Sequence, residues 1–168
     1  SGVAIAYPVG LETRLLGLID LVEMKAWLWD LDAKKSEDMK PNIVSLDQVP
    51  ADYAHDVEQA KLYHSELINQ LANFDDEIMN CVLEGKEPDA DAIRKAIRKG
   101  TIDSKIYPCI PGSAYKNKSV QYLLNCVRDY LPSPLDVPAA VGKDKDGNPV
   151  TCPTDPKAPF VALDFKIT

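Results

Sequence analysis

Apolar positions recur first at the two-residue spacing of β-strands and later at the three-or-four-residue spacing of helices. Residues 3–9 are apolar or small on both alternating sides, which predicts one strand covered on both faces and ending at its proline. Residues 15–20 and 24–29 predict two paired strands joined by a tight turn. After a charged loop over 30–42, residues 43–46 predict a further short strand.

Four later segments show helical spacing. Residues 52–71 predict a long helix, and residues 75–84 predict a shorter one that begins with three acidic residues and ends at a glycine. Residues 89–99 predict a third helix, with Gly100 as its C-terminal cap. The fourth helix covers 120–131. The apolar stripe of this last helix, which we expect to be buried, consists of Val120, Leu123, Leu124, Val127 and Leu131.

A second mostly apolar strand is predicted over 105–110, before the last helix. The small-residue turn 112–114 follows it, and we expect 116–118 to begin the helix. Backbone N–H groups at such a strand-to-helix turn can donate to a ligand, although small residues are common in any tight turn. Residues 132–159 are rich in Pro, Asp, Lys and Gly and have the composition of a linker, and 160–168 predict a final strand.

Composition, net charge and cysteine spacing exclude several classes of protein. The 168 residues are 45% hydrophobic and 27% charged, which suits one globular domain with an appendage. The net charge of −7 has the wrong sign for nucleic-acid binding and favours a basic partner. No apolar run reaches the roughly 18 residues that a membrane span needs. The four cysteines form no C-x-x-C pair, so we expect reduced thiols and a cytoplasmic location.

The candidate chemical groups favour structural roles. His55 and His64 are nine residues apart on one predicted helix and therefore face opposite sides, which excludes a shared metal. The acidic run 75–77 fits a helix start better than a carboxylate site. Residues 142–147 approach a calcium-loop pattern, but the glycine comes too early, so an Asp-Gly turn is expected. No G-x-S-x-G motif is present. We expect no catalytic residue and no metal site.

Several segments resemble the family of bacterial-type translation elongation factor G, in order and over nearly the whole chain. The clearest are the motif Gly112-Ser113-Ala114-Tyr115-Lys116-Asn117-Lys118 and the segment 130–139. Further similar segments are residues 7–10, 17–26, 83–85, 98–102, 158–160 and 165–167. The resemblance implies that the chain is a fragment of a longer GTPase that promotes ribosomal translocation.

The resemblance also implies a division of the chain. Residues 1–10 would be the last part of the GTPase domain sheet, 11–104 the inserted G-prime subdomain, and 105–131 the final strand and helix of the GTPase domain. Residues 132–168 would be a linker and the first strand of a following β-barrel domain. The expected fold class is α/β with an α+β insertion: a mixed sheet with helices packed against it, plus a short parallel strand pair from the edge of a doubly wound GTPase sheet.

In this family a Ser-Ala turn meets guanine through main-chain donors, which implies nucleotide contacts at Ser113 and Ala114. Pro111 replaces an expected small or thiol residue before the glycine. The chain has no G-x-x-x-x-G-K-[ST] phosphate loop, and its 117–120 segment lacks the Asp of N-K-x-D. Because phosphoryl transfer depends on positioning phosphates and Mg²⁺, we expect no catalysis and no cofactor in this chain, and GTP with Mg²⁺ in the parent protein.

The resemblance implies the ribosome as partner, in particular the C-terminal domain of the stalk protein. An acidic surface could steer a basic partner, although an ordinary solvated helix face explains any single residue as well. The candidates for this surface are Glu58, Glu66, Asp75, Asp76 and Glu77. We expect no membrane partner and no sequence-specific nucleic-acid binding.

Other hypotheses remain open from the sequence. The chain could be a nucleotide-binding enzyme domain completed by other parts, part of a paralogous translation GTPase that acts in ribosome recycling or antibiotic protection, or a stand-alone structural module. Truncation of a parent sheet would leave open strand edges and an uncovered apolar face, which predicts weak self-association.

Overall fold

The computed structural model describes residues 1–30, 40–163 and 166. The chain divides into two compact units, Ser1–Leu131 and Pro132–Thr168, which are described separately. The first unit contains both strands and helices, which confirms the expected mixed α/β class. Within the described ranges, no helix is long and apolar enough to cross a membrane. The charged loop expected over 30–42 lies largely outside the described residues.

The described residues of the first unit form two sheets. β1 (Gly2–Ala4) pairs in parallel with β6 (Tyr107–Cys109). The other sheet is an antiparallel meander in the order β2-β3-β4-β5. Its strands are β2 (Ala6–Val9), β3 (Gly17–Asp20), β4 (Lys25–Leu28) and β5 (Asn42–Ser45). The pair of strands expected near residues 15–29 and the short strand near 43–46 are therefore confirmed.

The single strand expected over 3–9 is wrong, because the chain changes sheets at Ile5. The Ile5 N–H donates to Cys109 of β6 at 3.1 Å, whereas the Ile5 carbonyl accepts from Leu21, after β3, at 3.1 Å. Ile5 is completely buried, so both backbone groups need partners. Pro8 does not end the strand, because it lies within β2, an edge strand where a missing N–H is tolerated.

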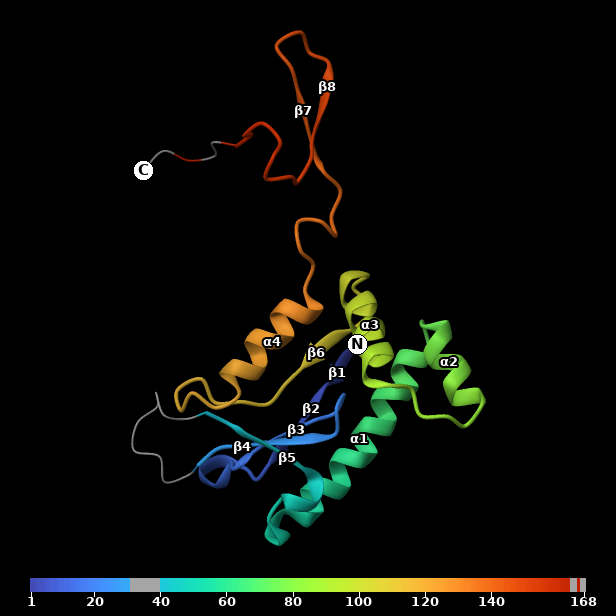
Figure 1. Cartoon of the computed structure of the whole chain (residues 1–168), viewed down its shortest axis with the longest axis vertical. Helices are drawn as coiled ribbons and strands as arrows, with labels where there is room; N and C mark the ends of the chain where they lie inside the picture. The colour runs from blue at the N-terminus through green and yellow to red at the C-terminus, as the bar shows by residue number, and fades with distance from the viewer. Residues whose placement is uncertain (31–39, 164–165, 167–168) are drawn as a thin grey trace. The chain divides into compact units, whose positions relative to one another are not determined.

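The helices lie close to their expected ranges. A single 3₁₀ turn (Ala51–Tyr53) leads into α1 (Ala54–Ala72). It is followed by α2 (Asp76–Leu83), α3 (Ala90–Ile102) and α4 (Val120–Tyr130). Figure 1 shows α1 running beside the strands of the meander. Leu67 and Leu71 of α1, Ile78 of α2 and Ile93 and Ile97 of α3 are buried in one core with Ile5 and Ile19. Full burial of such a side chain contributes about 1.5–3 kcal/mol.

Gly100 is not the C-terminal cap of α3, as the sequence suggested, because the helix continues to Ile102. Gly100 is buried, and a Cβ built on it would lie 2.6 Å from Cζ of Phe74. The glycine therefore serves close packing between α3 and the residues that follow α1.

The apolar stripe of α4 is mostly exposed, which contradicts the expectation that it is buried. Leu124 is 63% exposed, and Leu123, Val127 and Leu131 are also exposed. The buried side of α4 carries Tyr122 and Tyr130 instead, with half-buried Cys126 between them. The aromatic ring of Tyr122 stands edge-on to that of Trp27 in β4, with 5.2 Å between the ring centroids. The amphipathic pattern of α4 therefore identified an apolar face of the helix, but the face that packs against the rest of this unit is a different one.

The second unit contains a hairpin where the composition predicted a linker. β7 (Ala140–Lys143) and β8 (Pro149–Cys152) pair in antiparallel fashion. The expected Asp-Gly turn joins them: Asp144 Oδ1 accepts from Asp146 N at 2.8 Å and from Asn148 N at 2.9 Å, and Gly147 has φ +84°. Residues 160–163 form no strand, and most of the rest of the predicted final strand lies outside the described residues.

Candidate functional site

The turn between β6 and α4 closes on itself before the helix begins. Ser113 N donates to the carbonyl oxygen of Lys118 at 3.1 Å, and Lys118 N donates to the carbonyl oxygen of Ser113 at 3.0 Å. Inside this bridge, Asn117 N donates to the carbonyl oxygen of Ala114 at 3.0 Å. Residues 116–118 therefore precede α4, and the expectation that they form its first turn is wrong.

The base of this turn is narrow. A Cβ on Gly112 would lie 2.9 Å from Cβ of Ser119, so the glycine allows the two arms of the turn to approach. Asn117 and Ser119 have φ values of 51° and 70°, in the left-handed region that β-carbons disfavour. Ser119 is the N-cap residue of α4, but its side chain makes no capping hydrogen bond. The path of the chain is set by the turn rather than by a helix cap.

The two residues expected to contact nucleotide differ in their available donors. The N–H of Ser113 is committed to Lys118. Ala114 is exposed, and its N–H makes no hydrogen bond with any residue that the structure describes. Tyr115 beside it is 98% exposed. The Ala114 N–H is therefore available as a hydrogen-bond donor to a ligand.

The Lys118 side chain lies on the opposite, inner side of the turn. Lys118 is only 4% exposed, and its Nζ donates to the carbonyl oxygen of Leu15, between β2 and β3. Burial lowers the pKa of Lys118, and the positive charge of Lys116 lowers it further. The sequence carries no signal for this contact, because 103 positions separate the two residues.

The acidic candidates lie in α1, in α2 or, for Asp75, directly before α2, and these two helices pack against each other. On α1, Glu58 pairs with Lys61 at 2.7 Å, and Glu66 accepts from Gln70 Nε2 at 3.0 Å. At the start of α2, Asp76 and Glu77 are exposed. These four carboxylates are accessible from solvent.

Asp75 has a structural role, as the helix-start interpretation predicted. Its side chain accepts from Ile78 N at 3.2 Å and so caps α2, and it lies 3.4 Å from Nζ of Lys99 in α3. Only 13% of this side chain is exposed. Asp75 is therefore less available to a partner than the other acidic candidates.

The two histidines are in different environments. His55 is exposed, whereas His64 is half-buried, with Nδ1 2.6 Å from the carbonyl oxygen of Leu21 and Nε2 in contact with Glu87. This second arrangement was not anticipated from the sequence. In the portion of the chain that the structure describes, no group of three or more His, Cys, Asp or Glu side chains could hold a metal ion.

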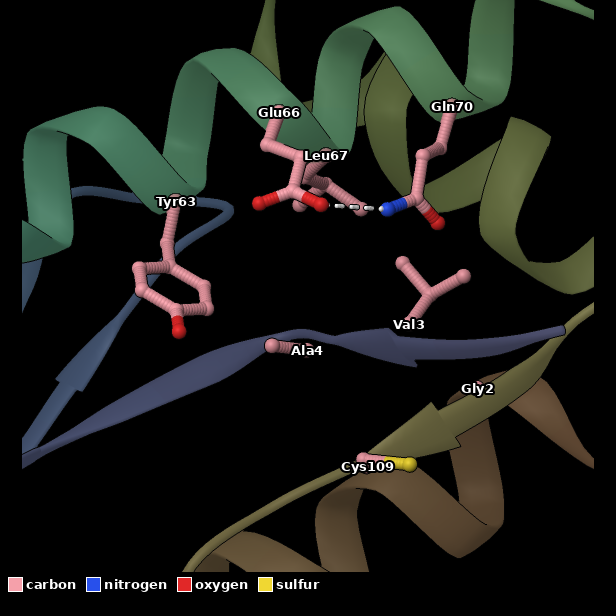
Figure 2. Close-up of a pocket in the computed structure, with 8 residues that line it drawn as sticks. All are labelled: Gly2, Val3, Ala4, Tyr63, Glu66, Leu67, Gln70 and Cys109. Atoms are coloured by element: carbon pink, nitrogen blue, oxygen red, sulfur yellow. Dashed lines mark hydrogen bonds between the residues drawn. The ribbon is translucent and has the colours of Figure 1, made fainter.

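A shallow hollow of about 230 Å³ lies between α1 and the sheet formed by β1 and β6. Figure 2 shows Glu66 and Gln70 bonded to each other above Val3, with Tyr63 to one side and Cys109 on β6. Glu66 and Gln70 are thus hydrogen-bonded to each other at this hollow. It therefore offers less for a polar ligand than the open end of turn 113–118.

No family model matches the chain. Over 164 residues it is 44% identical to elongation factor G of Ureaplasma parvum serovar 3, a match that covers 98% of this chain and 22% of that protein. Elongation factor G of Rhodopseudomonas palustris is 42% identical over 165 residues, with 98% and 23% covered. A crystal structure of a protein from Thermus thermophilus shares the fold, with TM-score 0.62, 22% identity, and 80% of this chain and 18% of that chain covered. The chain spans about a fifth of the length of the curated relatives it matches.

Proposed function

We propose that this chain, which is homologous to a segment of elongation factor G, is part of a GTPase that promotes ribosomal translocation during protein synthesis. The observation that carries the proposal is the 44% identity to elongation factor G over 98% of the chain. This segment contributes a guanine contact and a partner-binding surface, whereas the groups that hold the phosphates and Mg²⁺ belong to other parts of the protein. It performs no catalysis by itself.

Turn 113–118 is the proposed guanine contact. Guanine presents acceptor atoms, O6 and N7, on one edge. Ala114 is exposed and its N–H has no partner among the described residues, so this N–H can donate to such an acceptor. Ser113 contributes the adjoining backbone, with its own N–H closing the turn. One or two donors of this kind give selectivity for the base more than they give affinity, because most of a nucleotide's charge is on its phosphates.

The acidic faces of α1 and α2 are the proposed partner surface, and the C-terminal domain of the ribosomal stalk protein is the proposed partner. Glu58, Glu66, Asp76 and Glu77 are all exposed, and the whole chain carries a net charge of −7. Such a surface raises the rate of association with a basic partner in a salt-dependent manner. Asp75 supports this surface by holding the start of α2, where it accepts from Ile78 N.

The test is a titration of the ¹⁵N-labelled chain with the stalk C-terminal domain, followed by NMR at low and moderate salt. We expect localised shifts in α1 and α2 that weaken as salt rises. The variant Asp76→Asn/Glu77→Gln should weaken binding, whereas the matched variant Asp144→Asn/Asp146→Asn in the second unit should not. Absence of shifts at high partner concentration would refute the stalk contact. Equal effects of the two variants would refute the assigned surface.

A further inference from the structure

Lys118 makes an unusual contact for a lysine. Lysine is rarely buried without an acidic partner, because taking its charge out of water is costly. Lys118 is nevertheless 4% exposed, and no carboxylate among the described residues pairs with it. Its Nζ donates instead to the carbonyl oxygen of Leu15. This hydrogen bond joins turn 113–118 to the segment that leads into β3.

The backbone of the same residue fixes the turn. Lys118 N and O both bond to Ser113, at 3.0 and 3.1 Å, and Ser113 directly precedes Ala114. A displacement of Lys118 would therefore displace Ser113, whose peptide bond to Ala114 carries the Ala114 N–H. The Lys118 side chain is thus connected to the open end of the turn through a single backbone bridge.

The turn also needs an anchor, because its backbone is strained on both sides of Lys118. Asn117 and Ser119 are left-handed, with φ values of 51° and 70°. Such conformations persist only where the surrounding structure holds them. On the α4 side, no side-chain hydrogen bond caps the helix at Ser119. The side-chain contact of Lys118 with Leu15 reaches outside the turn and can supply this support.

We propose that Lys118 is a positioning residue: its buried side chain ties turn 113–118 to Leu15 and thereby holds the Ala114 N–H where it meets the guanine base. This inference rests on the proposed function of the turn in nucleotide binding. Lys118 acts through its bridge to Ser113, and the group that contacts the base is the Ala114 N–H.

The test compares three variants of the full-length protein that contains this segment. Lys118→Met removes the donor at nearly constant length, and Lys118→Arg retains a donor. Lys116→Met is the matched control, because Lys116 lies in the same turn but is exposed. The readouts are the affinities for GDP and ADP and the hydrogen exchange of the Ser113 and Ala114 amides, with and without GDP.

For Lys118→Met we expect GDP affinity to fall about tenfold, the order of one hydrogen bond lost or misplaced. The preference for GDP over ADP should fall with it, because adenine carries an amino group where guanine has O6. Exchange of the Ser113 amide should accelerate. Lys118→Arg should retain most of the GDP preference, and Lys116→Met should leave every readout within about twofold.

Two results distinguish failure of the Lys118 positioning role from failure of the proposed guanine contact. If GDP protects the Ala114 amide but Lys118→Met changes neither the GDP preference nor Ser113 exchange, the positioning role is refuted while the guanine contact stands. If GDP fails to protect Ala114 in the unmodified protein, the guanine contact itself is refuted. Should Lys118→Met fail to fold, loss of GDP preference in a folded Lys118→Leu variant, which also lacks a donor, supports the inference, and full retention overturns it.

Discussion

The hydroxyl of Tyr122 in α4 donates to the carbonyl oxygen of Ile5 at 3.2 Å, in the buried interior and across 117 positions of sequence. Ile5 is the residue at which the chain leaves β1 for β2. The same carbonyl accepts from Leu21 N at 3.1 Å. One oxygen thus joins the final helix of the first unit to the junction between its two sheets.

Tyr122→Phe should therefore lower the free energy of unfolding, by about 1 kcal/mol, because the hydrogen bond is lost but the carbonyl keeps its second donor. Urea denaturation measures the change. Tyr115→Phe, at a position that is 98% exposed, is the matched control and should have no effect. Equal stabilities of the Tyr122→Phe variant and the unmodified chain would show that this bond contributes nothing.

Asp20 makes stability depend on pH. Burial raises the pKa of Asp20 above its ordinary value of 3.8, while hydrogen bonds from Val22 N and Glu23 N partly oppose this effect. Between the unfolded-state pKa and the higher folded-state pKa, the folded chain binds more protons than the unfolded chain. Above this pH interval the buried Asp20 carboxylate therefore lowers the free energy of unfolding. This destabilisation becomes smaller as pH falls through the interval, because Asp20 is protonated first in the folded chain.

Asp20→Asn removes this titration and keeps an oxygen that can accept from Val22 N. We expect the variant to gain stability relative to the unmodified chain at pH 7 and to lose that advantage as the pH approaches 4. Urea denaturation of both proteins across this range gives the difference, in which contributions from other groups cancel. A stability advantage of Asp20→Asn that grows as pH falls would contradict a raised pKa of Asp20 in the folded chain.

Close packing at Gly100 gives a third prediction. A Cβ there would lie 2.6 Å from Phe74, so Gly100→Ala should reduce the free energy of unfolding by about 1–3 kcal/mol, as overpacking does. Phe74→Leu in the same chain should relieve part of the loss, because the two sites share the contact. Thermal unfolding of the two single variants and the double variant measures the coupling. Strict additivity would exclude the steric explanation.

The exposed stripe of α4 predicts weak self-association of the isolated chain. Leu124 is 63% exposed beside other exposed apolar residues of the helix. Sedimentation equilibrium should show a weight-average mass that rises with concentration, and Leu124→Lys should suppress the rise. Leu83→Lys, at an exposed leucine of α2, should suppress it less. A mass that stays monomeric at every concentration would rule out this role for the stripe.

Local patterns predicted local structure well. The helical spacing located α1 to α4, and the acidic run before Ile78 located the capped start of α2. Period-two alternation could not reveal that the chain changes sheets at Ile5, because Ile5 continues the alternation of its neighbours. That change depends on partners at Cys109 and Leu21, which are distant in sequence.

The candidate site was only partly predictable, for the same reason. Small residues indicated a turn at 112–114, and the proposal that it contacts nucleotide came from the resemblance alone. Lys118 closes the turn and contacts Leu15, although the lysine side chain suggests a surface position. Likewise, the amphipathic pattern of α4 identified an apolar stripe, but burial depends on what covers a face, and here Tyr122 and Tyr130 are covered instead.

The most direct test of the account is hydrogen exchange of the full-length protein that contains this segment, measured alone, with GDP and with ribosomes. We expect GDP to protect the backbone of turn 113–118, and ribosomes to protect α1 and α2. The second unit, including the β7–β8 hairpin, serves as the internal reference for GDP. If GDP changes exchange nowhere in turn 113–118 while it binds the protein, the assignment of this segment as a guanine contact is contradicted.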